Sequence, residues 1–184
     1  MKYTVAIDPG LLNWAWIIFD DAGVIVKTKH IKLSNKKGQN KRLNEIYKEL
    51  SELSLNEGFK IESAVIEKQF MNLMIQINGV LKAACDSLDC ETFFFVPSEW
   101  KKLITGKGNI AEDELTNFII DKYPEAIEFD EHRIDCIGIY LAHIENKLNP
   151  KIKPKKKKTA KKVELEANVI PKVIKKRSTG SKPG

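Results

Sequence analysis

The sequence predicts an α/β fold in which helices flank a central sheet. Three strand-like segments follow one another at the N-terminus, over residues 3–8, 13–19 and 24–31. After them the spacing of apolar residues becomes helical, and further strand-like runs recur between the helical segments. Three strands followed by alternating helices and strands, with further helices at the end, are typical of helices packed around one sheet. The length of 184 residues corresponds to one domain that can bury a substantial core.

The first three segments are expected to form an antiparallel meander. The first strand ends at Asp8, directly before a Pro-Gly turn. The second strand is rich in aromatic and β-branched residues, and we expect its Trp14 and Trp16 to pack on the faces of the sheet. A second turn, at residues 20–23, leads to a third strand in which polar and apolar residues alternate.

Helices and strands alternate along the middle of the chain. Apolar residues three and four positions apart predict helices over residues 36–54 and 71–88. Runs of apolar and β-branched residues predict strands over residues 61–66 and 92–96. Ser98, which follows a proline, is the predicted N-cap of the next helix.

Two more helical segments complete the predicted domain. A glycine-flanked loop at residues 105–109 precedes a helix over residues 111–122. The first turn of this helix is acidic, which the helix dipole favours. A Tyr-Pro pair ends the helix, and the last helical segment covers residues 130–148.

The charge is divided unevenly between two parts of the chain. From residue 149 onward there are too few large apolar residues for a core, so we predict a domain over residues 1–148 and a disordered, lysine-rich tail over residues 149–184. Residues 151–184 contain thirteen Lys or Arg and two Glu, a balance of +11, although the whole chain carries only +6. The first 150 residues therefore carry −5, so an acidic domain is followed by a basic tail.

The composition excludes some classes of protein. No apolar run reaches the ~20 residues that cross a bilayer, and the N-terminus lacks the basic-then-apolar pattern of a secretory signal. The three cysteines lack the spacing of a metal site, and we expect them to be reduced thiols that pack in helices or strands. These features predict an intracellular, cytoplasmic protein without a membrane span.

Three acidic residues lie beside apolar runs, where a strand or helix meets the end of the sheet. Asp8 and Glu67 each follow a strand, and Asp135 opens an apolar helical run. A single carboxylate in such a place commonly caps a turn, whereas three of them suggest one negatively charged pocket. Carboxylates that share one pocket, a few Å apart, cannot all ionise without a cation. The pattern therefore indicates a site for divalent metal ions, whose preferred ligands are oxygens.

Four segments resemble motifs of the RuvC Holliday junction resolvases, which are RNase H-like nucleases. The segments are Ala6–Gly10, Glu67–Phe70, Pro97–Asn109 and His132–His143. The resemblance runs from Lys2 to about Ile144 and keeps the order and spacing of the motifs. It implies an RNase H-like fold, with a mixed five-stranded sheet of three antiparallel strands followed by parallel strands. It also implies a metal-dependent endonuclease that cleaves Holliday junctions and other branched DNA.

The same resemblance implies a catalytic site that binds metal. It implies two Mg²⁺ ions, for which Mn²⁺ can substitute, and four residues that are both catalytic and metal-binding: Asp8, Glu67, His132 and Asp135. Many family members have an aspartate where this chain has His132. A neutral imidazole can bind a metal or transfer a proton, so His132 is the expected fourth member. The alternatives are Glu131, four residues before Asp135, in its place, or a role for His132 as a surface residue only.

Contacts to DNA are implied as well. Lys68 lies beside the acidic site, and Lys101 and Lys102 belong to the basic segment, although a solvated helix face would also explain this pair. Lys107 lies between two glycines, which allow a close approach to a phosphate. Phe70 would stack or wedge against a base where DNA strands exchange, and ordinary burial is the alternative.

Family members act as homodimers that nick two strands symmetrically. The apolar helix at residues 71–88 is the implied dimer face, although packing within one chain would also explain its pattern. The lysines at positions 155–158, 161 and 162 would add sequence-independent affinity for DNA; a nuclear-type address or a solubilising tail is the alternative. Because the chain is short, basic-tailed and unlike housekeeping resolvases, we expect a phage or viral origin.

Other functions are compatible with the same residues. The acids would also serve a nuclease for another substrate, such as an RNA–DNA hybrid, because they act on any phosphodiester. A non-cleaving module for branched DNA is a further alternative, if the departure at His132 has removed the chemistry. A sugar-kinase or actin-type fold also begins with an Asp-containing strand, but the chain is too short for its two lobes and lacks a second phosphate-binding loop.

Overall fold

The computed structural model describes residues 1–36 and 38–150, with all of their side chains except those of residues 54–57 and 73. Five strands form one sheet in the order β3-β2-β1-β4-β5. Their bounds are β1 Tyr3–Asp8, β2 Asn13–Phe19, β3 Ile25–Lys32, β4 Ile61–Glu67 and β5 Glu91–Phe95. The first three strands are antiparallel, and β4 and β5 continue the sheet in parallel with β1. The predicted mixed five-stranded sheet is therefore confirmed.

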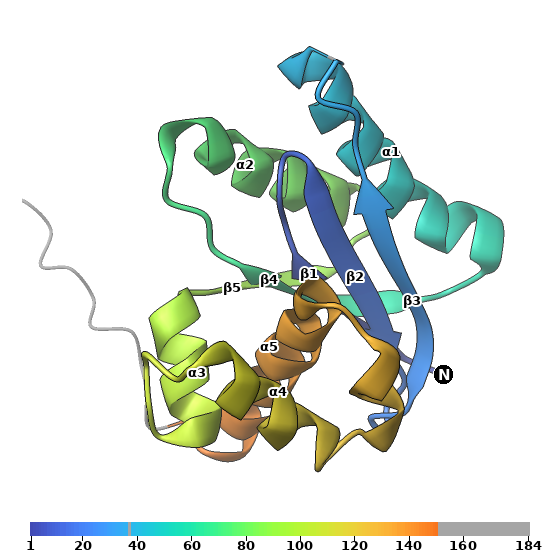
Figure 1. Ribbon diagram of the computed structural model, residues 1–184. Coiled ribbons are helices and arrows are strands. Elements are labelled where there is room, and N and C mark those ends of the chain that lie inside the picture. The colour runs from blue at the N-terminus through green and yellow to red at the C-terminus, as the bar shows by residue number, and fades with distance from the viewer. Residues whose placement is uncertain (37, 151–184) are drawn as a thin grey trace, which may run out of the picture. The chain divides into compact units, whose positions relative to one another are not determined.

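Helices cover both faces of this sheet (Figure 1). α1 and α2 pack on one face, and α3, α4 and α5 pack on the other. The helices are α1 Gln39–Glu57, α2 Asn72–Ser87, α3 Pro97–Thr105, α4 Glu112–Ile120 and α5 Glu131–Leu148, with a short 3₁₀ helix, η1, at Pro124–Glu128. None of the helices in this described part of the chain combines the length and apolarity that a membrane span needs. The predicted lysine-rich tail lies outside the described residues, apart from its first two positions.

Two predicted helix starts are wrong by a few residues. α1 begins at Gln39 rather than at residue 36. α3 begins at Pro97, with Val96 at the N-cap position, so Ser98 is not the N-cap. Proline is favoured at the first helical position because it lacks an N–H that would otherwise be unpaired, and because its φ already suits a helix. At this helix start the preference of proline therefore outweighs that of serine.

The pleat of the strands divides side chains between two hydrophobic cores. Successive residues of a strand point to opposite faces. On β1, Ile7 is buried with residues of α1 and α2, whereas Ala6 is buried with residues of α5. Asp8 has the same parity as Ala6, so its carboxylate lies on the α5 side. On β4, Val65 belongs to the α5 core, and the same rule places Glu67 on that side.

Small residues let α5 lie close to the centre of the sheet. Ala15 of β2 is fully buried, and the thiol of Cys136 donates a hydrogen bond to the Ala15 carbonyl at 3.4 Å. Further along α5, the Tyr140 ring stacks on Phe19 of β2 with 3.8 Å between centroids. These contacts hold α5 against the strands and so determine where its first turn lies.

Other buried residues agree with the sequence analysis. Trp14 and Trp16 are each 1% exposed and pack on the α1–α2 side of the sheet, as predicted. The cysteines are free thiols, all buried, as predicted: Cys85, Cys90 and Cys136.

Candidate active site

Three elements that are distant in the sequence meet at one end of the sheet. β1 and β4 pair in parallel, so Asp8 and Glu67 end adjacent strands at about the same level. The first turns of α5 supply His132 and Asp135. These four side chains line one pocket of about 350 Å³. Its other lining residues are Lys101, Ile110, Glu112, Leu115, Thr116, Glu131 and Ile134.

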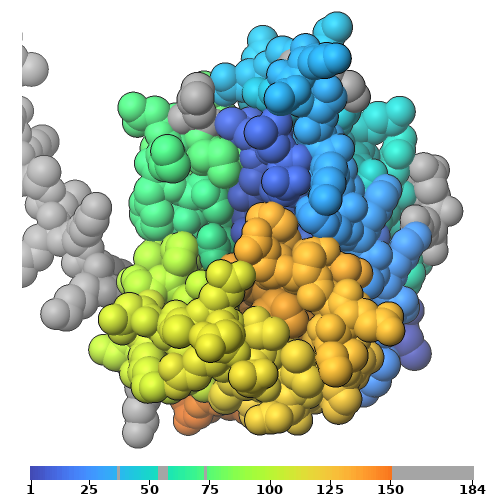
Figure 2. Space-filling model, viewed as in Figure 1, coloured from blue at the N-terminus to red at the C-terminus, as the bar shows by residue number. Residues whose placement is uncertain are grey.

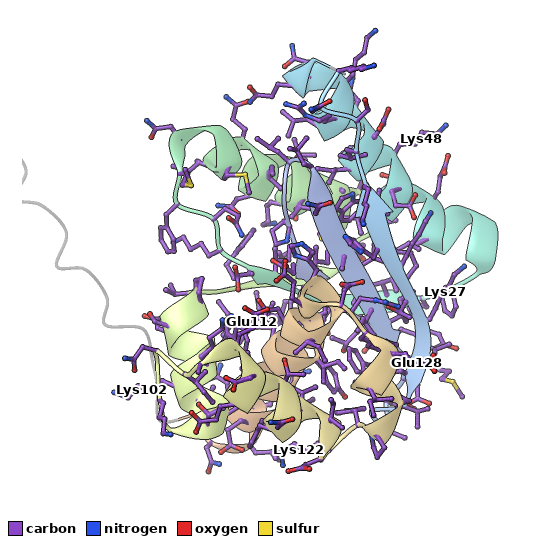
Figure 3. All side chains as sticks on the ribbon, viewed as in Figure 1. Lys27, Lys48, Lys102, Glu112, Lys122 and Glu128 are labelled. Carbon is purple, nitrogen blue, oxygen red and sulfur yellow. The ribbon has the colours of Figure 1, made fainter. Side chains whose placement is uncertain are left out.

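The pocket is bordered by the helices that follow β5. Figure 2 shows the start of α5 (orange), the α3–α4 region (yellow-green) and the first strands (blue) meeting on one face. Glu112, labelled in Figure 3, borders the pocket from the start of α4. The fold thus brings together side chains from β1, β4, α3, α4 and α5.

His132 contacts Asp8 directly. Its Nδ1 lies 2.7 Å from Asp8 Oδ2, and this hydrogen bond raises the pKa of His132 because the carboxylate stabilises the imidazolium. Asp130 caps the helix that carries His132, since its carboxylate accepts a hydrogen bond from the backbone N–H of Arg133 at 3.1 Å. Glu131 is the more exposed neighbour, and its Oε1 lies 3.6 Å from His132 Nε2. Of the two alternatives, His132 is therefore the one in contact with Asp8.

The other two acids hold their protons unusually tightly. Burial raises the pKa of Glu67 to about 7, and the negative charge of Asp8 adds to this effect. Burial also raises the pKa of Asp135 to about 7, where the Lys101 ammonium opposes the rise and the neighbouring acids reinforce it. Burial and the neighbouring acids thus disfavour the ionised forms of both carboxyls, and a divalent cation in the pocket would favour these ionised forms.

The donor atoms of the pocket fit a hard divalent cation. Carboxylates and an imidazole make an oxygen-rich ligand set, which suits Mg²⁺ or Mn²⁺ better than softer metals. Within residues 1–36 and 38–150, no three His, Cys, Asp or Glu side chains are already grouped so as to hold one ion. His132 is hydrogen-bonded to Asp8, and Glu67 accepts a hydrogen bond from Trp100 at 3.0 Å. Metal binding would therefore require Asp8 and His132 to rearrange within the pocket.

The predicted DNA-binding lysines lie in different environments. Lys101 lines the pocket, and its ammonium lies 5.1 Å from the centroid of the Trp100 ring, so it is more than part of a solvated helix face. Lys102 is exposed on the same helix (Figure 3). Lys107 is also exposed but is paired with Glu114 at 2.5 Å. A phosphate would have to compete with this ion pair.

The loop after β4 presents Phe70 to solvent. Its side chain is 53% exposed, so the alternative of ordinary burial is wrong. The ammonium of Lys68 lies 5.4 Å from the centroid of the Phe70 ring. Asn78 of α2 holds the loop through two hydrogen bonds with the backbone of Gln69, at 2.8 and 3.2 Å. An aromatic ring and a cation therefore lie side by side on a loop that α2 supports.

Several residues near the pocket were not predicted from the sequence. His30 of β3 lies 2.9 Å from Asp130, measured from Nδ1 to Oδ2, and its ring centroid is 5.2 Å from that of His132. No sequence spacing links β3 to the start of α5. Glu112 and Thr116 line the pocket from α4, and their separation of four residues places them on one helix face. That spacing is the only local signal for this pair, and the helix dipole also explains an acidic first turn.

The chain is similar to bacterial proteins named crossover junction endodeoxyribonuclease RuvC. It is 30% identical over 154 residues to the protein of Ehrlichia ruminantium (strain Gardel), and the match covers 76% of this chain and 94% of the relative. It is 29% identical over 161 residues to that of Ehrlichia canis (strain Jake), and this match covers 79% of this chain and 97% of the relative. No model of a protein family matches the chain.

Solved structures are similar in fold. The Thermus thermophilus RuvC structure has a TM-score of 0.67 at 17% identity, over 79% of this chain and 95% of that one. T. thermophilus RuvC in complex with a Holliday junction substrate has a TM-score of 0.68 at 18% identity, over 80% and 95% of the two chains. These similarities agree with the strand order and show that the fold is RNase H-like.

Proposed function

The chain belongs to the RuvC family of crossover junction endodeoxyribonucleases, and from this premise we propose that it cleaves Holliday junctions and other branched DNA. The reaction is a metal-dependent hydrolysis of phosphodiester bonds. The observation that carries the proposal is the pocket at the strand ends, which combines four groups suited to this chemistry: Asp8, Glu67, His132 and Asp135.

The same four side chains would hold two Mg²⁺ ions, or Mn²⁺ in their place. When bound, the ions would activate the attacking water and stabilise the leaving oxygen. In the site without metal, the hydrogen bond between Nδ1 and Asp8 orients the imidazole of His132, so Nε2 is the ring atom that can take a proton from a water molecule. Lys101 brings a positive charge to the same pocket, where it can contact the phosphate to be cleaved.

DNA outside the pocket would be held by the remaining predicted contacts. Lys68, Lys102 and Lys107 are exposed and can reach phosphates. The exposed ring of Phe70 is suited to stack on an unpaired base at the junction, because every base has an apolar face. The basic tail at residues 151–184 would add affinity that weakens with salt.

A homodimer would place two such pockets on one four-way junction and nick two strands symmetrically. Two exposed apolar side chains at the start of α2 support this part of the proposal: Met71 and Ile75 are each at least half exposed. The mass of the protein in solution, measured by light scattering, tests it. A cytoplasmic location and a phage or viral origin remain our predictions, and the relatives named above are bacterial.

A synthetic four-way junction tests the proposed activity. With Mg²⁺, the wild-type protein is expected to introduce paired nicks. Asp8→Asn is expected to bind the junction but to cleave it at least ~100-fold more slowly, because a metal ligand matters more than the groups around it. The measurement is single-turnover cleavage, with junction binding followed separately by gel shift.

Competing substrates separate the alternatives. A flap and an RNA–DNA hybrid are incubated under the same conditions, and preferential cleavage of the hybrid would assign a different nuclease activity. A wild-type protein that binds the junction without cleaving it, together with a His132→Asp variant that cleaves, would identify a binding module that has lost the chemistry.

A further inference from the structure

We propose that Trp100 is a positioning residue for Glu67, whose carboxylate it orients through its indole N–H. The inference rests on the proposed function, since it assigns Glu67 to the metal site. Trp100 lies on α3, is fully buried, and donates from Nε1 to Glu67 Oε2 at 3.0 Å. The side chain of Gln69 lies 3.4 Å from the other oxygen, Oε1. The indole therefore makes the shorter contact to this carboxylate.

Gly138 of α5 makes room for the indole. A Cβ atom at this position would come within 2.4 Å of the Trp100 ring, so no other residue can replace the glycine without moving one of the two elements. Asp135 lies three residues before Gly138 on the same helix and thus on the same face. The ring is thereby held by the helix that carries Asp135 while its N–H holds Glu67 at the end of β4. Trp100 sets the position of one predicted ligand relative to the others.

The other two tryptophans provide a contrast. Trp14 and Trp16 are as deeply buried as Trp100, yet their Nε1 atoms have no hydrogen-bond partner among the described residues. Changing any of the three to phenylalanine removes the same atoms from a core. Only at Trp100 does the change also remove a donor to a carboxylate, a type of hydrogen bond that is stronger than a neutral one. Trp16→Phe is therefore a matched control for Trp100→Phe.

The test measures binding of Mn²⁺ to the protein without DNA, from the electron paramagnetic resonance signal of the free ion. Trp100→Phe is expected to weaken Mn²⁺ binding about 10- to 100-fold, the usual effect of removing a group that orients a metal ligand. The Mg²⁺ concentration for half-maximal junction cleavage should rise by a similar factor. Trp16→Phe should lower the Tm without changing either quantity.

Gly138→Ala provides a second variant. It should also weaken Mn²⁺ binding, because the added methyl displaces the indole, and it should have a smaller effect in the Trp100→Phe background than in the wild type. The inference is overturned if Trp100→Phe binds Mn²⁺ as Trp16→Phe does while the wild-type protein binds the ion and cleaves the junction. A wild-type protein that binds no Mn²⁺ and cleaves nothing would instead overturn the proposed function, and the inference with it.

Discussion

Glu67 and Asp135 lie in surroundings that disfavour their ionised forms. Burial and neighbouring acids raise the pKa of each to about 7. In the unfolded chain both groups titrate near pH ~4, so between pH ~4 and ~7 the folded, metal-free protein keeps protons that the unfolded chain has released. Its free energy of unfolding therefore falls as the pH rises through this window. Ionisation of these two residues thus lowers the free energy of unfolding when no cation is present.

Asp135→Asn is expected to stabilise the metal-free protein at pH 8 and to abolish cleavage. The amide keeps the volume of the side chain but removes one of the crowded negative charges. We expect a gain on the order of 2 kcal/mol, since each unit of pKa shift corresponds to ~1.4 kcal/mol. Urea unfolding with EDTA measures it, and the gain should shrink at pH 5, where Asp135 is protonated. Glu125→Gln, at an exposed position of η1, is the control. If Asp135→Asn were less stable than the wild type at pH 8, the buried charge of Asp135 would not be what destabilises the metal-free protein.

His143 shows the opposite dependence on pH in the core. It is 1% exposed and lies 4.6 Å from the Phe93 ring, and in the described part of the chain neither of its ring nitrogens has a hydrogen-bond partner. Burial lowers the pKa of His143 from 6.5 to about 4, so the fold accepts only the neutral ring. The stability that this provides is complete above pH ~6.5 and is lost as the pH falls toward ~4.

His143→Leu is therefore expected to make the protein more resistant to acid. Between pH 7.5 and pH 4.5, urea unfolding should show that the variant loses up to about 3 kcal/mol less stability than the wild type does. At pH 7.5 the histidine is neutral, so the difference in stability between the two proteins at that pH measures the change in packing and can be subtracted. Equal losses of stability in the two proteins would show that His143 does not titrate on unfolding.

At the scale of the element, the loop between β4 and α2 depends on the helix that follows it. Asn78 of α2 pairs with both backbone groups of Gln69, one residue before Phe70. Without these hydrogen bonds from Asn78, the loop and the Phe70 ring that it carries could adopt several positions. The orientation of Phe70 toward solvent is thus a property of the β4–α2 unit rather than of the loop alone.

Asn78→Ala is expected to loosen this loop and leave the metal site unchanged. The variant loses two hydrogen bonds with Gln69, which should cost about 1–3 kcal/mol and speed hydrogen exchange at the Gln69 amide. Junction binding should weaken, whereas Mn²⁺ binding should not. Asn72→Ala, at an exposed position on the same helix, is the matched control. Unchanged exchange at Gln69 would contradict the role given to Asn78.

At the scale of the whole described domain, two hydrophobic cores lie on opposite faces of one sheet. The pocket opens where β1 and β4 end beside the second core. Ends of adjacent parallel strands commonly form sites in α/β proteins, because the chain leaves the sheet there and side chains from neighbouring strands converge. Strands of the sheet and the start of α5 therefore position the acids.

Divalent cations are expected to stabilise the domain more at pH 8 than at pH 5.5. At pH 5.5 protons on Glu67 and Asp135 compete with the cation, whereas at pH 8 both groups can ionise fully. Excess Mg²⁺ should raise the Tm at pH 8 by about 2–4 °C for each kcal/mol of binding free energy. Asp8→Asn should show a smaller rise. Equal shifts of Tm at the two pH values would contradict the coupling between proton and metal.

Local signals in the sequence were enough to predict the order of most helices and strands. Apolar runs ending at Asp8 and Glu67 identified two strands, and helical spacing identified the helices between them. These signals are local, because the periodicity of a segment follows from the face that it buries. Asp8, Glu67 and Asp135 could be grouped into one pocket from their places at the ends of elements, and the resemblance to a known family added His132.

Contacts between distant side chains depend on the tertiary structure. The hydrogen bond from His132 to Asp8 joins residues 124 positions apart, and the bond from Trp100 to Glu67 joins residues 33 positions apart. Neither pair has a local signature, since each depends on sheet register and on how closely α5 approaches the strands. Gly138 is a glycine in a helix by sequence, and it becomes a determinant of the site only because the Trp100 ring packs against it.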